Sequence, residues 1–166
     1  PELELGTVMK KIREAFPEVF EGCEGKDACE TARQGVLGFG STIFAVKPGD
    51  GSAREQAASC QKVLGGWANI ANEYATKRYR SNCINWGILP FTLDPDTSFT
   101  YEVGDYVFVE GIRKGIIDGK EEFSAKVLRA NGDVENITLY VKGLTPDEKD
   151  IILDGCLMNY YKKHNN

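Results

Sequence analysis

The chain has 166 residues, of which 42% are hydrophobic and 27% are charged, and its formal net charge is -5. This length fits one domain with a substantial core, and the composition is that of an ordinary globular protein. The sequence contains no apolar run of about 18 residues and no signal-peptide pattern, and the acidic balance argues against a nucleic-acid-binding surface.

The cysteines argue against both a disulfide framework and a self-contained metal centre. There are five of them, and an odd count without paired close spacing is typical of a reduced, cytoplasmic chain. The sequence has no C-x-x-C motif, and its single histidine, His164, lies in the terminal tail. We therefore expect a cytoplasmic protein that binds no metal itself. The cysteines are Cys23, Cys29, Cys60, Cys83 and Cys156.

Residues 1–31 are predicted to form a helical extension. A capping Thr7 and a stripe of apolar residues predict a helix as far as about Phe16, where Pro17 ends it. Such a stripe indicates packing. The acidic segment 18–26 is predicted as a loop, and residues 27–33 as a short helix. The stripe consists of Val8, Met9, Ile12 and Phe16.

The most informative stretch follows an apolar, β-branched run at residues 41–46, which predicts a buried strand. A Pro/Gly turn comes next, and a helix is predicted from Ala53 to Leu64 with Ser52 as its N-cap. Helix N-termini expose unpaired N–H groups and therefore favour anions. Gly49 and Gly51 flank Asp50 and allow a ligand to approach the backbone closely. Turn chemistry alone favours a plain cap at Ser52 beside a solvated Arg54 over an anion site.

The next elements complete a βαβ unit. A strand at Trp67–Ala71 is expected to pair in parallel with the strand before the turn. A helix from about Tyr74 to Trp86 is expected to end at Gly87. Its first turns carry a basic cluster, which a solvated helix face explains better than a ligand site. The cluster consists of Lys77, Arg78 and Arg80.

The second half of the chain is richer in strands. Strands are predicted at residues 88–93, 106–109, 123–128 and 134–141, with a hairpin at Asn131-Gly132-Asp133. A capping box from Thr145 to Glu148 begins a final helix. No linker or repeat interrupts the chain, so the sequence predicts one mixed α/β domain.

Two strings of residues carry a family resemblance. Gly51-Ser52-Ala53-Arg54-Glu55-Gln56-Ala57-Ala58 resembles the Gly-Ser-Ser-Arg-Glu-His-Ala-Ala segment of the aconitase superfamily. Residues 81–91, Ser-Asn-Cys-Ile-Asn-Trp-Gly-Ile-Leu-Pro-Phe, resemble its Thr-Asn-Leu-x-x-x-Gly-Leu-Leu-Pro-Leu segment. They occur in the family's order with a glycine pair, Gly65-Gly66, between them. The resemblance extends roughly from Ala32 to the C-terminus.

The resemblance implies an α/β fold with three β/β/α layers, the C-terminal swivelling domain of the family, in which a mixed sheet or partial barrel carries outer helices. In the family this domain closes over an iron–sulfur domain of the same polypeptide or of a large subunit. Residues 1–166 would then form one swivelling domain, with residues 1–31 as the extension. Pro1 in place of an initiator methionine favours an excised domain, although methionine before proline is commonly removed from separate subunits.

The resemblance also implies roles for the turn. In the family the first serine is the base that removes a substrate proton, and the arginine binds a substrate carboxylate. These roles fall on Ser52 and Arg54, with Gly49, Asp50 and Gly51 as the supporting loop. The second family serine is Ala53 here, which leaves only its backbone to contact substrate, and the family histidine is Gln56. Citrate and isocitrate are therefore not assumed as substrates, and an inactive relative stays an alternative.

The expected activity is a hydro-lyase acting on a hydroxy di- or tricarboxylic acid. A helix dipole contributes about 0.3–2 kcal/mol, which together with Arg54 does not turn a serine hydroxyl into a base at neutral pH. The rest must come from a partner that encloses the site and carries a [4Fe-4S] cluster, because this chain is expected to bind no cofactor. The alternative is a non-catalytic module that binds RNA or protein. The net negative charge of the chain argues against RNA as the partner.

Overall fold

A computed structural model describes residues 10–17 and 37–164 of the chain. The described residues belong to two compact units. One contains residues 10–17, 37–39, 100–108 and 126–136, and the other contains residues 40–99, 109–125 and 137–164. The predictions for Thr7, Val8 and Met9, for segments 18–26 and 27–33, and for Cys23 and Cys29 lie outside the described residues.

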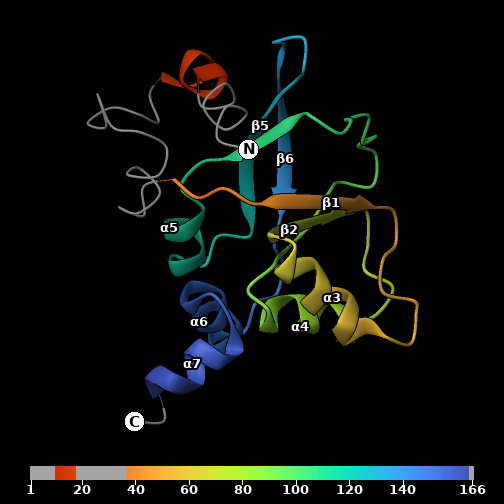
Figure 1. The fold of residues 1–166 in the computed structure, drawn as a ribbon, viewed down its shortest axis with the longest axis vertical. Coiled ribbons are helices and arrows are strands. Elements are labelled where there is room, and N and C mark those ends of the chain that lie inside the picture. The colour runs from red at the N-terminus through yellow and green to blue at the C-terminus, as the bar shows by residue number, and fades with distance from the viewer. Residues whose placement is uncertain (1–9, 18–36, 165–166) are drawn as a thin grey trace. The chain divides into compact units, whose positions relative to one another are not determined.

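A six-stranded mixed sheet in the order β1-β2-β3-β6-β5-β4 forms the centre of the fold, and the sheet is open (Figure 1). β1 pairs with β2 and β2 with β3 in parallel, whereas β3 and β6 are antiparallel. The α/β fold with a mixed sheet and flanking helices is therefore confirmed. The strands are β1 Ser41–Ala45, β2 Gly66–Ala71, β3 Leu89–Thr92, β4 Tyr106–Val109, β5 Glu122–Leu128 and β6 Val134–Tyr140.

Five labelled helices accompany the sheet, and α3 and α4 lie side by side against β2 and β3 (Figure 1). Two differences from the sequence prediction concern the second half. The short helix α5 was not expected, and the final helix is divided because Gly155 takes a left-handed conformation with a φ of 90° between α6 and α7. The helices are α3 Arg54–Val63, α4 Lys77–Asn85, α5 Ile112–Ile117, α6 Pro146–Asp154 and α7 Leu157–His164.

β1 does not match the predicted buried strand. It lies at the edge of the sheet, where β2 is its one partner among the described strands, and its first three residues are exposed. Ile43 is 47% exposed and Val46, just after the strand, is 65% exposed. A β-branched apolar run has the same appearance at an edge and at a centre, because strand propensity does not specify how many neighbours a strand has.

The buried face of α3 also differs from the apolar pattern in the sequence. Ala58 and Gln61 are its buried residues, whereas Ala57, Cys60 and Leu64 are exposed. The helical spacing of Ala57, Cys60 and Leu64 in the sequence predicts that Cys60 belongs to the core, and its exposure shows that this prediction is wrong. The face of α3 that carries Gln61 packs against β2, where the Gln61 side chain donates to Asn69 and to the Ala68 carbonyl.

Each unit has its own apolar cluster. In the first unit, residues 10–15 are helical, and Ile12 and Phe16 are buried with Leu37 and Leu128, as the stripe predicted. In the second unit, one cluster consists of Ala58 of α3, Tyr79 and Cys83 of α4, and Ile88. That residues 1–166 form a single swivelling domain stays a prediction.

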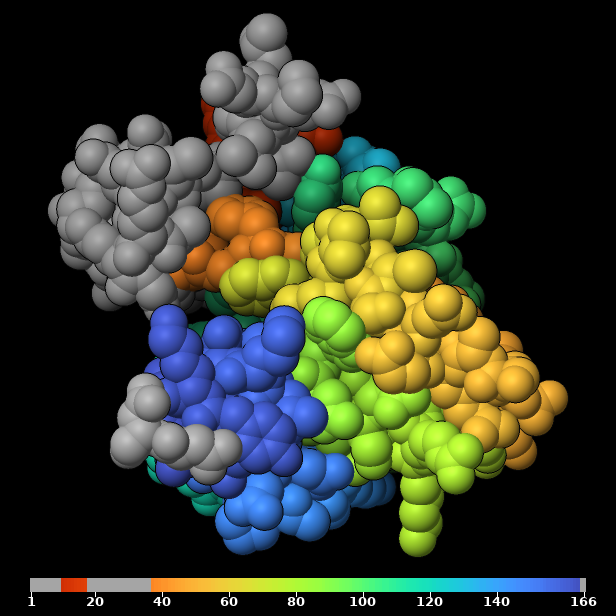
Figure 2. All heavy atoms as spheres, turned by 60° about the horizontal axis from the view of Figure 1, so that its bottom comes forward, coloured from red at the N-terminus to blue at the C-terminus, as the bar shows by residue number. Residues whose placement is uncertain are grey.

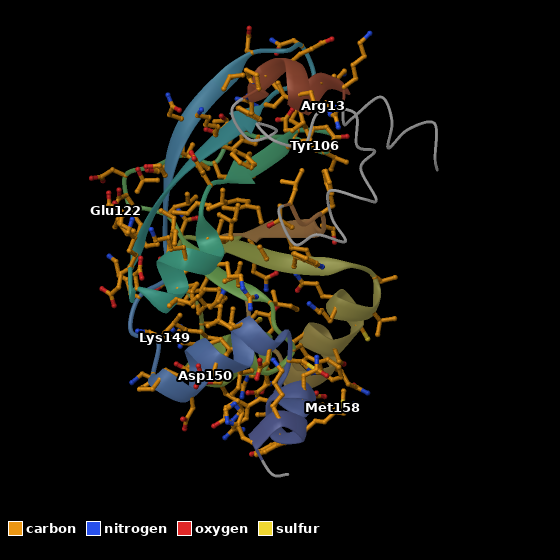
Figure 3. All side chains as sticks on the ribbon, turned by 90° about the vertical axis from the view of Figure 1, so that its left-hand side faces the viewer. Arg13, Tyr106, Glu122, Lys149, Asp150 and Met158 are labelled. Carbon is orange, nitrogen blue, oxygen red and sulfur yellow. The ribbon has the colours of Figure 1, made fainter. Side chains whose placement is uncertain are left out.

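The capping box of α6 is confirmed. The Thr145 hydroxyl accepts a hydrogen bond from the Glu148 N–H at 3.2 Å, and the Glu148 carboxylate accepts one from the Thr145 N–H at 3.0 Å. Figure 3 shows Lys149 and Asp150 further along α6, and Met158 on α7. Met158 is 67% exposed, and none of the residues of α7 is buried.

Gly87 follows the end of α4, as the sequence predicted. A substitution at this glycine tests the fold. The φ of Gly87 is +65°, and a Cβ built on it would lie 1.8 Å from the Gly155 carbonyl oxygen. We expect Gly87→Ala to lower the free energy of unfolding by about 2–5 kcal/mol, from backbone strain and overpacking together. Urea denaturation of the full chain measures this loss.

Gly143→Ala is the matched control, because Gly143 also has a positive φ, +63°, but its added Cβ would meet nothing within 4 Å. It should cost only the strain, about 1–2 kcal/mol. Equal losses for the two variants would contradict the close approach of Gly87 to Gly155.

Candidate functional site

The candidate site lies where two parallel strands end. β1 ends at Ala45 and β2 at Ala71, and these residues are register partners. The segments that leave the two strands therefore start at the same edge of the sheet, which is the place where open α/β sheets bind ligands. After β1 the chain forms the turn at residues 46–53, and after β2 it forms the approach to α4.

The segment between β2 and α4, residues 72–76, is attached to the turn by backbone hydrogen bonds. The Glu73 N–H donates to the Val46 carbonyl at 3.2 Å, and the Ala75 N–H donates to the Pro48 carbonyl at 2.9 Å. An exposed ion pair between Lys47 Nζ and Glu73 Oε1, at 2.5 Å, adds little to stability because solvent screens it. The turn is thus attached to a second segment rather than projecting freely.

Gly49 is the tightest point of the turn. Its φ is +97°, and a Cβ on it would lie 2.4 Å from Tyr79 Cβ, so only glycine fits. Its carbonyl oxygen accepts two hydrogen bonds, from Arg54 Nε and from Thr76 Oγ1, each at 3.1 Å. The turn therefore anchors the arginine of the first sequence motif by its Nε.

The terminal nitrogens of the anchored Arg54 side chain can still bind a ligand. Arg54 is partly buried, and the Nη1 and Nη2 atoms have no hydrogen-bond or ion-pair partner among the residues that the structure describes. A guanidinium held in this way presents parallel N–H groups, the geometry that a carboxylate matches. The Arg54 side chain can therefore bind an anion without first giving up a protein partner.

Ser52 is exposed, but it is not the N-cap that the sequence predicted. α3 begins at Arg54, its N-cap is Ala53, and no side chain of the capping residue bonds to the first turn. Ser52 lies one residue before the cap, and Asp50, Gly51 and Ala53 beside it are exposed as well. Figure 2 shows the segment after β1 and α3 on one face of the molecule, beside α4.

The second sequence motif caps the first. The Asn82 side-chain oxygen accepts from the Glu55 N–H at 3.0 Å, and its amide nitrogen donates to the Arg78 carbonyl at 3.3 Å. Trp86 Nε1 donates to Glu55 Oε1 at 2.7 Å. Two residues of the 81–91 string thus bind Glu55, which follows Arg54 directly. Asn82 supplies the acceptor that Ala53 cannot offer.

A buried polar network lies beneath the turn. Asn69 of β2 is 3% exposed; its amide donates to the Tyr79 hydroxyl at 3.2 Å and to Cys83 Sγ at 3.4 Å, and its oxygen accepts from Gln61. Burial raises the pKa of the Cys83 thiol to about 11, against the opposing hydrogen bonds from Tyr79 and Asn69. Burial also raises the pKa of Tyr79 to about 12. Both groups are therefore neutral near pH 7.

The basic cluster on α4 behaves as a helix face. Arg80 Nη1 pairs with Glu148 Oε1 at 3.4 Å, and its Nη2 donates to the Lys142 carbonyl at 2.8 Å. Lys77 and Arg78 are exposed on the first turn. Arg80 is therefore already bound by Glu148 of α6 and by the Lys142 carbonyl that precedes this helix. The three cations of the cluster thus offer no contiguous basic surface of the kind that RNA requires.

Sequence reasoning missed several residues that shape this site: Asn69, Thr76 and the Trp86–Glu55 pair. Thr76 is the N-cap of α4 and was placed inside a helix predicted from Tyr74. The threonine itself was the available signal, since it is a common N-cap residue. Asn69 gave no such signal, because a polar residue within a predicted strand does not reveal its partners.

Metal and membrane patterns were searched over the same residues. Within 10–17 and 37–164, no group of three or more His, Cys, Asp and Glu side chains could hold a metal ion. The helices of this part of the chain are too short or too polar to cross a membrane.

Comparison with known proteins adds two kinds of match. Residues 41–96 match the family model of the aconitase C-terminal domain, and this range contains the turn, α3 and α4. The 3-isopropylmalate dehydratase small subunit of Metallosphaera sedula is 33% identical over 132 residues, which cover 80% of this chain and 68% of the relative. The homoaconitase small subunit of Thermus thermophilus is 31% identical over 123 residues, 74% of this chain and 64% of the relative.

A longer relative is also similar. Aconitate hydratase A of Bradyrhizobium diazoefficiens is 27% identical over 115 residues, which are 68% of this chain. The matched part is only 12% of that relative's length. The match therefore spans about two thirds of each small subunit and a minor part of the longer relative.

The raised pKa of Cys83 predicts a pH dependence of stability. Because the folded state holds the thiol neutral up to about pH 11 and the ordinary value is 9.0, unfolding becomes easier as the pH rises between these values. We expect the free energy of unfolding to fall by about 1 kcal/mol between about pH 8 and pH 10 through this thiol. Urea denaturation at the two pH values measures the fall.

Cys83→Ala should show a smaller fall over this range, whatever its stability at pH 8. Cys60→Ala, which removes an exposed thiol of α3, is the control for the loss of a thiol as such. The same fall in Cys83→Ala and wild type would refute the assignment.

Proposed function

Because the chain belongs to the aconitase superfamily, we propose that it is the swivelling part of a hydro-lyase that adds water to, or removes it from, a hydroxy di- or tricarboxylic acid. One observation carries the proposal. The turn after β1 presents an exposed Ser52 two residues from an arginine whose Nε is anchored and whose fork is available. These residues lie within the matched range 41–96.

Each residue of the turn has a role in this proposal. Ser52 acts as the base that removes a proton from the substrate carbon, and Arg54 binds a substrate carboxylate. Gly49, Asp50 and Gly51 form the supporting loop, in which the two glycines allow the substrate to approach the backbone because neither has a side chain. A water-excluding partner is required, since an exposed serine hydroxyl beside one arginine is a weak base.

Ala53 bears on the substrate. The family places a second serine at this position, and a methyl group there removes one hydrogen bond to the substrate, worth about 0.5–1.5 kcal/mol. Only the Ala53 backbone is then left to contact it. We therefore propose an acid other than citrate or isocitrate. 3-Isopropylmalate, named in one relative, is the first acid to test, and aconitate, whose hydration gives citrate or isocitrate, is tested as the acid that the proposal excludes.

The described cysteines do not fit an iron–sulfur cluster. Cys83 is fully buried and hydrogen-bonded, Cys60 lies on the exposed face of α3, and Cys156 lies between α6 and α7. We therefore place the [4Fe-4S] cluster on a partner, either a large subunit or another domain of the same polypeptide. Relatives of both lengths support this proposal: two named as small subunits, and a longer aconitate hydratase of which the match covers 12%.

The first test of the function removes the proposed base. In the enzyme reconstituted with its iron–sulfur partner, obtained by co-purification with the full chain, Ser52→Ala should lower kcat about 10²- to 10⁴-fold, because the base acts in the transition state. KM should change little. Steady-state kinetics with 3-isopropylmalate and with aconitate provide both values.

Ser59→Ala, in the helix α3 that follows Ser52, is the control. Its hydroxyl donates to the Gln56 carbonyl within α3, so its loss should leave kcat unchanged. Wild-type kcat for Ser52→Ala would remove Ser52 from the chemistry and favour a binding role for the chain.

The second test concerns the carboxylate. Arg54→Lys replaces a planar fork by a point charge, so KM should rise about tenfold through loss of a second charge-assisted hydrogen bond. Arg78→Lys is the control, because Arg78 is exposed on α4 and the proposal gives its side chain no role. Equal KM values for the two variants would contradict the role of Arg54.

A further inference from the structure

The Thr76 hydroxyl connects α4 to the turn. It accepts a hydrogen bond from the Tyr79 N–H at 3.2 Å as the N-cap of α4, and it donates its own proton to the Gly49 carbonyl at 3.1 Å. A hydroxyl has one proton and two lone pairs, so both bonds form at once with the directions fixed. The only proton that Thr76 Oγ1 carries is therefore directed at Gly49.

We propose that Thr76 is a positioning residue for Arg54 and acts through the Gly49 carbonyl, an inference that rests on the proposed carboxylate-binding role of Arg54. That carbonyl is the acceptor for Arg54 Nε, at 3.1 Å. The chain of contacts runs from the Tyr79 N–H through the Thr76 hydroxyl and the Gly49 carbonyl to the guanidinium. Its direction determines where the free Nη1 and Nη2 atoms point.

Gly49 is the link that needs this support. A glycine at a φ of +97° has no side chain to restrict its peptide, so neighbouring contacts must fix the direction of its carbonyl. The Pro48 carbonyl, bound by the Ala75 N–H at 2.9 Å, fixes the peptide on one side of Gly49. Thr76 fixes the peptide on the other side, which is the one that Arg54 uses.

The other end of the chain of contacts is rigid. Tyr79 is 7% exposed, its ring lies against Gly49, and its hydroxyl accepts from Asn69 in the centre of the unit. The position of Thr76 is therefore set by the buried network, and the hydroxyl transmits this position to the turn. A valine has nearly the same shape but neither accepts nor donates.

The test compares Thr76→Val with Thr76→Ser in the full chain. The first readout is the solvent exchange rate of the Arg54 Nε–H, measured by NMR and assigned from its absence in Arg54→Lys. Thr76→Val should raise this rate about fivefold or more, as the loss of about 1 kcal/mol of hydrogen bonding implies. Thr76→Ser, which keeps the hydroxyl, should restore the wild-type rate.

Thr145→Val is the matched control for capping. Thr145 caps α6 with the same hydroxyl-to-N–H bond, at 3.2 Å, but it makes no contact with the turn. Both valine variants should lose comparable stability in urea, about 1 kcal/mol, whereas only Thr76→Val should change the Arg54 exchange rate. If Thr76→Val does not fold, Thr76→Gly replaces it, because glycine is nearly as good an N-cap and has no hydroxyl.

The second readout is the kinetics of the reconstituted enzyme with 3-isopropylmalate and aconitate. Thr76→Val should raise KM about fivefold with little change in kcat, and Thr145→Val should change neither. An Arg54 exchange rate in Thr76→Val equal to that in Thr145→Val would overturn the proposal, as would a failure of serine to restore it. An absence of turnover in the wild-type enzyme would instead overturn the proposed function, and the exchange rates would still decide the role of Thr76.

Discussion

The attachment of the turn at residues 46–50 to the approach of α4 is the constraint on which the site depends. Three acceptors in this turn, the carbonyls of Val46, Pro48 and Gly49, receive donors from Glu73, Ala75 and Thr76. Each bond contributes only about 0.5–1.5 kcal/mol, but together they fix a Pro/Gly segment that local propensity leaves free. The parallel pairing of β1 and β2 makes the attachment geometrically available, because it brings both segments to the same sheet edge.

The buried polar network between α3, β2 and α4 also helps to hold the turn and α4 in place, but it costs free energy of folding. Gln61 Oε1 is buried and has no partner among the described residues, and an unsatisfied buried acceptor costs about 1–3 kcal/mol. An apolar core would avoid that cost. The network in return specifies how the two helices sit on β2, because Asn69 binds Gln61 on one helix and Tyr79 on the other.

The two sequence motifs are joined by contacts that neither motif reveals. Glu55 belongs to the first string, and it is held by Asn82 and Trp86 of the second. The spacing along the chain predicted the elements, since the strand, the turn, the helix and the glycine stop are local patterns. It did not predict that an asparagine nearly thirty positions later would cap α3, so Ser52 was given a role that Asn82 fills.

The sequence by itself determined the types of the elements that it located, which did not include α5, together with the parallel βαβ unit, the capping box of α6, the helix end at Gly87 and the family. These depend on periodicity, turn chemistry and short motifs, which are properties of neighbouring residues. The tertiary structure alone decided that β1 is an edge strand, that α3 buries Gln61 instead of Cys60, and that Thr76 directs the Gly49 carbonyl. Those outcomes depend on which elements become neighbours in space, because a hydrogen bond or a buried face requires a partner that distant parts of the chain supply.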